Sequence, residues 1–314
     1  PYPISPAAVR AAQRALEDSP LYPDPEASEL KRVIARREGL DISQVFCSNG
    51  SDEALALSFL AFFNQGSRIL FPDITYSFYP VYARLFDIDY EAVPLDAEFK
   101  IDINKYMKAN GGIVFPNPNA PTGIFMPVSE LEKLAEYNLN QAVVIVDEAY
   151  IAFGGESAVR LIEKYPNLLI VRTMSKSHSM AGLRVGYCLG NQSLIEGLNR
   201  IKNSFNSYVV DRCAMAAAAA GLADETYYAG IARKIMGTRE RVGESLIRMG
   251  FKVLPSAANF IFASPPGGDA RGLYEFLRLN GVLVRYFEGE RVNKFIRVTI
   301  GTDEQMDEFL RITD

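Results

Sequence analysis

The sequence has little of what metal centres, disulfide networks and membrane spans require. Its 314 residues contain one histidine, His178, and three widely spaced cysteines, Cys47, Cys188 and Cys213. A single imidazole excludes a histidine-rich metal centre, and we predict no bound metal. The cysteines indicate reduced thiols of a cytoplasmic protein rather than a disulfide framework. No apolar run approaches the ~20 residues that span a bilayer, and no signal peptide is visible, so we expect no membrane partner.

The charge and the size of the chain narrow the class of protein further. Lysine and arginine total 33 against 38 aspartates and glutamates, which gives a net charge of -5. This acidic balance argues against nucleic acid as the main partner. Hydrophobic residues make up 48% of the chain, as in ordinary globular proteins, and the length suits two domains.

Apolar strand-like segments alternate with helical ones through most of the chain. Candidate strands lie at 68–71, 112–115, 142–146, 168–172 and 184–190, and candidate helices between them include 51–63, 76–85 and 129–137. Uniformly apolar strands separated by helices predict an α/β fold with a mainly parallel sheet covered on both faces. Long helices follow from about residue 191, and 251–314 resembles a smaller α+β unit.

Three polar residues follow predicted strands of this sheet. Asp147 comes directly after one strand, and Lys176 and Asn119 lie shortly after two others. Ligands collect at the carboxyl ends of parallel strands. Asp147 alone is also consistent with a helix cap, and Lys176 alone with a lysine at a strand end. Together they favour pyridoxal phosphate, which needs a lysine for covalent attachment and a carboxylate to keep its ring nitrogen protonated.

A phosphate site is expected at "SNGSDEAL" (48–55), where a glycine precedes a helix. The backbone N–H groups of Ser51 and Asp52 are free in the first turn of such a helix and attract a phosphate. A plain capped helix is the alternative interpretation, and the segment lacks the lysine and spacing of a P-loop. Thr173 and Ser175 could supply hydroxyls, and Arg184 a guanidinium, to the same phosphate.

A series of motifs along the whole chain resembles the aspartate aminotransferase superfamily, the pyridoxal phosphate enzymes of fold type I, and within it the histidinol-phosphate aminotransferases. The motifs are "PY" (1–2), "YPDP" (22–25), "SNGSDEAL" (48–55), "DITYSFY" (73–79), "NPNAPTG" (117–123), "VDEAY" (146–150), "SKSHSMAGLRVGY" (175–187), "SAANFI" (256–261), "VR" (284–285) and "IRVTIGT" (296–302). Each is a weak signal alone, but their order and spacing are specific.

The resemblance implies a large domain at 26–215, with a mainly parallel seven-stranded sheet flanked by helices. It implies a smaller α+β C-terminal domain at 216–314, joined by 1–25. The implied reaction interconverts histidinol phosphate and 2-oxoglutarate with imidazole-acetol phosphate and glutamate, in histidine biosynthesis. Threonine-phosphate decarboxylase, an aromatic aminotransferase and a non-enzymatic effector-sensing domain remain as alternatives.

The same resemblance assigns roles by position. Lys176 would hold the cofactor and move the proton at the substrate, Asp147 would bind the pyridine nitrogen, and Tyr150 the phenolic oxygen. Tyr76 would stack on the cofactor ring. The phosphate would be held by Thr173, Ser175, Arg184 and the amides of Ser51 and Asp52, and by Tyr22 of a second subunit, which implies a homodimer with shared active sites.

Arg297 and Arg285 are expected to bind the acidic groups of the substrate. Tyr2 of the first motif is also expected to contact the substrate. A surface ion pair of Arg285 with Glu288 or Glu290 is the alternative. The chain departs from the family where an asparagine usually precedes "PTG": that position is Ala120, and Asn119 is the expected substitute. Phe205 is a second departure: it stands where some members have a tyrosine near the substrate phosphate, and that contact is expected to move to Tyr208. A third is the start of the chain at "PYPISP", which indicates a clipped N-terminus.

Overall fold

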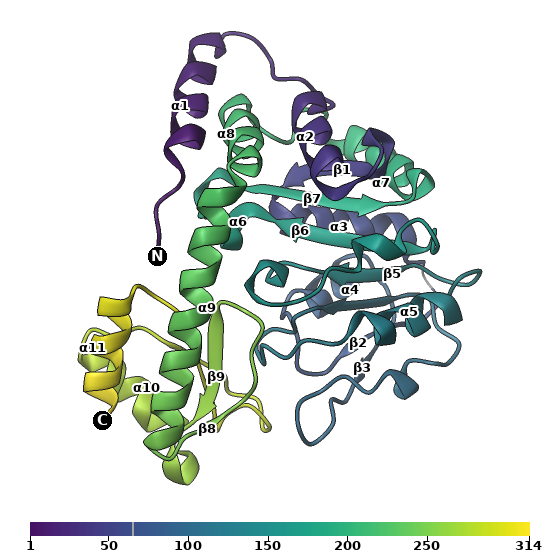
Figure 1. The fold of residues 1–314 in the computed structure, drawn as a ribbon. Coiled ribbons are helices and arrows are strands. Elements are labelled where there is room, and N and C mark those ends of the chain that lie inside the picture. Colours follow the sequence, from purple (N-terminus) through teal and green to yellow (C-terminus); the bar gives the residue numbers. More distant parts are fainter. Residues whose placement is uncertain (65) are drawn as a thin grey trace.

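Two β-sheets and a long helix, which runs alongside the smaller sheet toward the larger one, organise the chain in the computed structural model, which describes residues 1–64 and 66–314 (Figure 1). The strands are β1 (Val45–Asn49), β2 (Ile69–Pro72), β3 (Tyr90–Val93), β4 (Ile113–Pro116), β5 (Val144–Asp147), β6 (Leu168–Thr173), β7 (Val185–Gly190), β8 (Lys252–Val253), β9 (Phe260–Ser264), β10 (Arg285–Tyr286) and β11 (Ile296–Thr299). The helices are α1 (Pro6–Ala15), α2 (Ser28–Glu38), α3 (Gly50–Phe62), α4 (Tyr79–Leu85), α5 (Val128–Tyr137), α6 (Met174–Ser177), α7 (Gln192–Phe205), α8 (Arg212–Ala223), α9 (Glu225–Arg248), α10 (Ala270–Leu279) and α11 (Asp303–Thr313).

The larger sheet has seven strands in the order β1-β7-β6-β5-β4-β2-β3 and is mainly parallel, as predicted. Only β7 runs antiparallel to its neighbours, β6 and β1. Each strand expected from the sequence lies within two residues of an observed one. The sequence pattern does not predict β1 and β3, because β3 is an edge strand with exposed side chains and β1 ends in polar residues that lead directly into α3.

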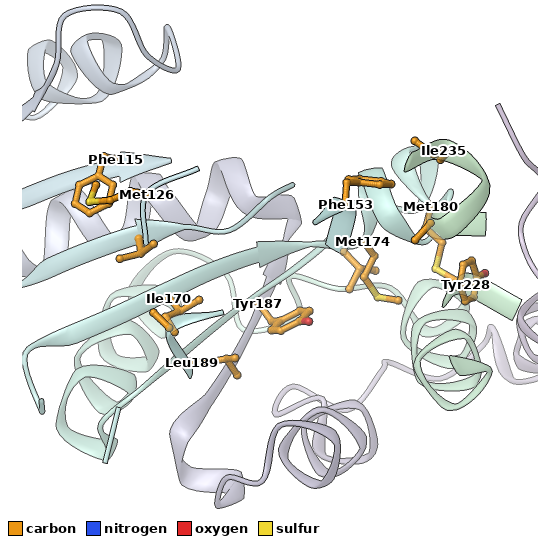
Figure 2. Packing of buried hydrophobic residues seen from close by; sticks show 14 of the residues in the cluster. Phe115, Met126, Phe153, Ile170, Met174, Met180, Tyr187, Leu189, Tyr228 and Ile235 are labelled. Carbon is orange, nitrogen blue, oxygen red and sulfur yellow. The ribbon is translucent and has the colours of Figure 1, made fainter. Parts of the chain in front are cut away.

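Helices cover both faces of this sheet, which explains why β2, β4 and β5 are buried along their whole length. Side chains alternate between the faces, so Ile145 packs into one cluster while Val144 and Val146 pack into the other. The cluster that contains Val144 and Val146 extends beyond the sheet. Figure 2 shows it running from Ile170 of β6 to Tyr228 of α9, which ties α9 to the sheet.

The smaller sheet has the antiparallel order β10-β11-β9-β8 and packs against α9, with α10 and α11 beside it. An aromatic cluster joins the two parts of the molecule: Leu95 and Phe99, which follow β3, pack with Phe262 and Phe295. At the end of the molecule away from the small sheet, α1 packs along α8 (Figure 1). Because α8 extends across position 215, the domain boundaries expected from the sequence stay a prediction.

The helix expected at 76–85 begins later, at Tyr79. Pro80 lies in the first turn of α4, where its missing N–H and fixed φ are tolerated. Residues 73–78 are therefore a connection at the carboxyl end of β2, and this connection carries Tyr76. The later start of α4 brings Tyr76 to the same edge of the sheet as the ends of β5 and β6.

Candidate active site

The carboxyl ends of β5 and β6 bring Asp147 and Lys176 to one edge of the large sheet. Asp147 is the last residue of β5, and Lys176 lies in the short α6 that follows β6. Val171 of β6 pairs with Asp147, so the two strands end almost level. Residues that are 29 positions apart in the sequence therefore share one site because of strand register.

The carboxylate of Asp147 is buried, and within the described residues it forms no ion pair. It accepts hydrogen bonds from the N–H of Ala149 at 3.0 Å and from the hydroxyl of Tyr79 at 3.3 Å. Burial raises the pKa of Asp147 to about 6, although both hydrogen bonds and the charge of Lys176 oppose this change. The site therefore holds a carboxylate that a nearby cation would stabilise.

The ammonium group of Lys176 makes no hydrogen bond or ion pair in the part of the chain that the structure describes, and it lies 5.8 Å from the centre of the Tyr150 ring. Desolvation lowers the pKa of Lys176, the positive charge of Arg297 lowers it further, and Asp52 and Asp147 act in the opposite direction. A lysine with a lowered pKa is more readily available as a nucleophile.

The start of α3 lies against β7 at very close range. Gly50 begins the helix with φ +76°, and a Cβ at this position would collide with the guanidinium of Arg184. A Cβ at Gly186 of β7 would collide with Gly50 and with the N atom of Ser51. Only glycines permit this approach, which brings the free N–H groups of the helix start beside an arginine.

Polar side chains surround this helix start. Arg184 pairs with Asp52 at 3.2 Å and donates a hydrogen bond to the Ser175 hydroxyl at 3.4 Å, and the hydroxyls of Thr173 and Ser175 lie 3.0 Å apart. Tyr76 donates to Asp52 at 2.6 Å. Of the residues predicted to hold a phosphate, all except Tyr22 are thus assembled in one place.

The side chain of Asn119, predicted to bind the cofactor, is hydrogen-bonded within the chain. Its Nδ2 donates to the carbonyl of Ile74 at 3.0 Å and to the hydroxyl of Thr122 at 3.1 Å, and its Oδ1 accepts from the hydroxyl of Thr75 at 3.2 Å. The bonds to Ile74 and Thr75 hold the connection that carries Tyr76, and the bond to Thr122 lies within the loop of Asn119 itself. Both of its amide hydrogens are engaged in these bonds, and its role in place of the asparagine missing at Ala120 stays a prediction.

Arg285 and Arg297 are directly paired residues of the antiparallel strands β10 and β11. Arg297 is close enough to Tyr150 and Lys176 for its charge to act on the pKa of both. Glu288, one of the two glutamates considered as a surface partner for Arg285, instead pairs with Arg271 at 3.2 Å. Arg297 of this pair therefore lies toward Lys176, with Arg285 beside it on β10.

Tyr22 and Tyr2 lie outside this cluster. Tyr22 is 79% exposed, and its ring stacks on Tyr208 at 4.8 Å, while Arg212 donates to the Tyr22 carbonyl at 2.8 Å. The ring centre of Tyr2 lies 5.8 Å from the ammonium group of Lys234 on α9. The structure does not bring Tyr2 to Lys176, and a role for it in substrate binding stays a prediction.

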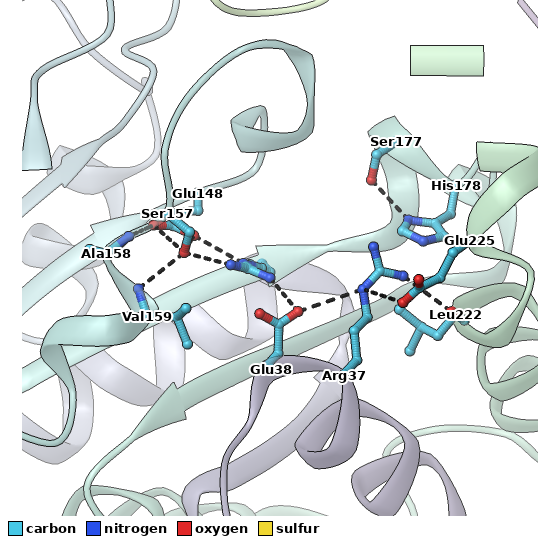
Figure 3. A network of polar contacts seen from close by, with 11 residues as sticks. Arg37, Glu38, Glu148, Ser157, Ala158, Val159, Ser177, His178, Leu222 and Glu225 are labelled. Atoms are coloured by element: carbon cyan, nitrogen blue, oxygen red, sulfur yellow. Dashed lines mark hydrogen bonds and ion pairs between the residues drawn. The ribbon is translucent and has the colours of Figure 1, made fainter. Parts of the chain in front are cut away.

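The sequence analysis did not identify two buried supports of the site, Tyr79 and Glu148. Glu148 follows Asp147 and receives hydrogen bonds from Arg172 at 3.0 Å, from Ser157 and from the N–H of Ala158 (Figure 3). Arg172 also pairs with Glu38 of α2 at 2.7 Å. This network fixes the end of β5 against β6 and α2. Its only sequence signal is the acidic residue next to Asp147 in "VDEAY".

This strand order, with the site at the carboxyl edge of the sheet, is the architecture of fold type I aminotransferases. The family model described as aminotransferase class I and II matches residues 1–312, and the chain belongs to this family. A histidinol-phosphate aminotransferase of Clostridium beijerinckii is 51% identical over 98% of this chain and 86% of that protein. One from Pseudomonas putida is 51% identical over 97% of this chain and 87% of that protein.

Solved structures agree on the fold. The histidinol-phosphate aminotransferase of Clostridium acetobutylicum has a TM-score of 0.92 at 24% identity, over 100% of this chain and 95% of that one. The enzyme of Sinorhizobium meliloti, solved in complex with pyridoxal-5'-phosphate, has a TM-score of 0.89 at 24% identity, over 99% of this chain and 88% of that one. No helix among the described residues is long and apolar enough to cross a membrane.

Proposed function

We propose that this protein is a pyridoxal phosphate-dependent aminotransferase that acts on L-histidinol phosphate and 2-oxoglutarate in histidine biosynthesis. The observation that carries the proposal is the meeting of Lys176, Asp147 and Arg297 from two sheets at one site. The relatives at 51% identity share the name of this activity. Amino transfer requires a lysine, a carboxylate and an anion receptor within reach of one substrate.

The residues present fit the cofactor. The buried Asp147 lacks a cationic partner among the described residues, as expected for a carboxylate that holds a protonated ring nitrogen. Arg184, Ser175 and the N–H groups at the start of α3 suit its phosphate. With both hydrogens of Asn119 engaged, Tyr150 is the remaining donor for the phenolic oxygen.

Pyridoxal phosphate would supply a conjugated ring that accepts the electron pair released at the substrate Cα. The chain's own groups do the rest. Lys176 would hold the cofactor through Nζ and, once released, carry the proton from Cα. Asp147 would keep the ring nitrogen protonated, and Arg297 and Arg285 would bind the phosphate of the amine and the carboxylates of the oxoacid in turn.

We also propose a homodimer in which Tyr22 completes the site of the second subunit. Tyr22 is exposed and stacks on Tyr208, and Leu21 and Phe205 are also exposed apolar side chains. An apolar surface of this kind favours association with another copy. The Arg212 hydrogen bond to the Tyr22 carbonyl ties this segment to the start of α8.

The proposed function is tested by steady-state transamination with 2-oxoglutarate as acceptor. L-Histidinol phosphate, phenylalanine, tyrosine and threonine phosphate are compared as amino donors at equal enzyme concentration. We expect the highest kcat/KM with histidinol phosphate. A preference for phenylalanine or tyrosine would identify an aromatic aminotransferase, release of carbon dioxide from threonine phosphate would identify a decarboxylase, and no turnover would favour a sensing domain.

A further inference from the structure

The two arginines of the small sheet lie side by side without an acidic partner. As directly paired residues of β10 and β11, Arg285 and Arg297 extend from the same face of the sheet. Within the described ranges neither forms an ion pair, and Nε of Arg297 is buried without a hydrogen-bond partner. Desolvation lowers the pKa of Arg297, and the charge of Arg285 lowers it further. Repulsion between the two guanidiniums therefore needs another form of compensation.

Phe287 supplies a contact to both guanidiniums. Its ring centre lies 5.7 Å from Cζ of Arg285 and 6.0 Å from Cζ of Arg297. Arg297 also lies 5.1 Å from the ring centre of Phe260. The face of an aromatic ring attracts a cation without neutralising its charge, whereas a carboxylate would occupy the place of an incoming anion. The rings hold the arginines and leave their N–H groups free.

The ring of Phe287 is itself fixed by the aromatic cluster between the two sheets. It packs edge-on against Phe262, with ring centres 6.0 Å apart, and Phe262 stacks on Phe295 at 4.7 Å. Phe295 contacts Phe99 of the large domain at 5.3 Å. The position of the arginine pair is thus connected through aromatic contacts to the part of the molecule that carries Lys176.

We propose that Phe287 is a positioning residue that sets the spacing of Arg285 and Arg297, so that the pair accepts a phosphate dianion. This inference rests on the proposed function of the same site, since the dianion would belong to the amino donor. Two fixed guanidiniums can each make charge-assisted hydrogen bonds to one phosphate. Two arginines free to rotate would have to lose side-chain entropy for every binding event.

The neighbouring Tyr286 provides a matched control. Side chains alternate along a strand, so Tyr286 points to the opposite face of β10, where it stacks on Tyr274 at 5.9 Å. It also has a cation contact, with Arg271 at 5.9 Å. Tyr286→Leu therefore removes a comparable ring and a comparable contact from the same strand without touching the arginine pair.

The test compares cofactor-loaded wild type, Phe287→Leu and Tyr286→Leu. Calorimetry with inorganic phosphate measures anion affinity without turnover, while the bound cofactor fills its own phosphate site, and kinetics give KM for histidinol phosphate and kcat. We expect Phe287→Leu to raise both the phosphate Kd and this KM about three- to thirtyfold, the range of a lost cation–π contact, with kcat within about twofold. Tyr286→Leu should change neither constant.

An unchanged phosphate Kd in Phe287→Leu, or an equal rise in Tyr286→Leu, would overturn the proposal, as would a loss confined to kcat. If Phe287→Leu does not fold, Phe287→Met keeps an apolar side chain of similar length without a ring, and the same expectations apply. Failure of the proposed function is distinguishable, because wild type would then not turn over histidinol phosphate whereas the phosphate titration still reports on Phe287.

Discussion

Tyr79 donates its hydroxyl hydrogen to the buried carboxylate of Asp147, with the two oxygens 3.3 Å apart. The tyrosine comes from α4 and the aspartate from the end of β5, and both are buried between the sheet and its helices. Burial and the negative charge of Asp147 raise the pKa of Tyr79 well above its usual value, so the hydroxyl remains a donor. The hydrogen bond favours the ionised form of Asp147, which a cofactor nitrogen would require.

The cofactor-free protein should lose stability as pH rises through the titration of Asp147. Its pKa of about 6 in the folded state lies above the value of 3.8 for an unperturbed aspartate, so the folded state binds the proton more tightly. Stability attributable to this group is present below pH ~4 and lost by pH ~6, a difference of roughly 3 kcal/mol. Asp147→Asn should lack this slope in urea unfolding measured from pH 4.5 to 7.5.

The exposed Asp89 provides the matched control for this experiment, because Asp89→Asn makes the same chemical change at the surface. It should unfold with the pH dependence of wild type. If Asp147→Asn and wild type gave parallel stability curves, the carboxylate would not be destabilised by burial. Saturation with pyridoxal phosphate should remove the difference, because a protonated ring nitrogen would compensate the ionised carboxylate.

Tyr79→Phe should extend the same loss of stability to higher pH. Removal of the hydroxyl takes away a hydrogen bond to the ionised carboxylate, which raises the pKa of Asp147 further. A hydrogen bond to a charged group contributes about 1.5–3 kcal/mol, so the upper end of the window should move by about one to two pH units. Tyr82→Phe, on the same helix, controls for the loss of a buried hydroxyl, since that hydroxyl has no hydrogen-bond partner in the described chain.

Lys176→Ala should abolish transamination and remove the visible absorbance of the lysine-bound cofactor. No other lysine follows a strand of the large sheet at this edge in the described chain. Lys164→Ala, at an exposed lysine paired with Glu132, is the control and should retain both activity and spectrum. Turnover of Lys176→Ala near the wild-type rate would show that the assigned site is wrong.

A mixture of Tyr22→Phe and Lys176→Ala proteins should recover activity if the subunits share sites. In such a heterodimer one site carries both substitutions and the other carries neither. Activity should rise above that of the Lys176→Ala parent, and the restored site should bind pyridoxal phosphate with wild-type affinity. If every active site in the mixture kept the weaker affinity of Tyr22→Phe, the tyrosine would act within its own chain.

Arg285→Ala and Arg297→Ala should affect the two half-reactions differently. Arg297 lies near Lys176, and its loss should impair both the amine and the oxoacid. Arg285 is exposed, and its loss should mainly raise KM for the phosphorylated donor. The rise should correspond to about 2–3 kcal/mol of binding free energy, the value of a lost charge-assisted contact. The measurement is the ratio of kcat/KM for histidinol phosphate over histidinol, with Arg271→Ala as control. A ratio that stays constant would remove Arg285 from the site.

The sequence by itself determined the fold class and the family, and it predicted the residues of the candidate cofactor site. Apolar runs such as those of β4 and β5 are recognisable because burial on both faces requires apolar side chains at every position. The small polar residues around Lys176 and the glycine before Ser51 were equally visible, since chemistry and close backbone approach restrict the residue types there. These are local requirements, and a sequence records them locally.

Only the tertiary structure decided how distant residues act on one another. The hydrogen bonds of Asn119 to Ile74 and Thr122, and of Tyr79 to Asp147, depend on strand register and on where α4 begins. The contact of Phe287 with two arginines depends on the pairing of β10 with β11. Asparagine, tyrosine and phenylalanine are compatible with many environments, so their identity in the sequence does not specify a partner. Packing of the whole chain selects the partner, because each contact must satisfy the geometry of both sheets at once.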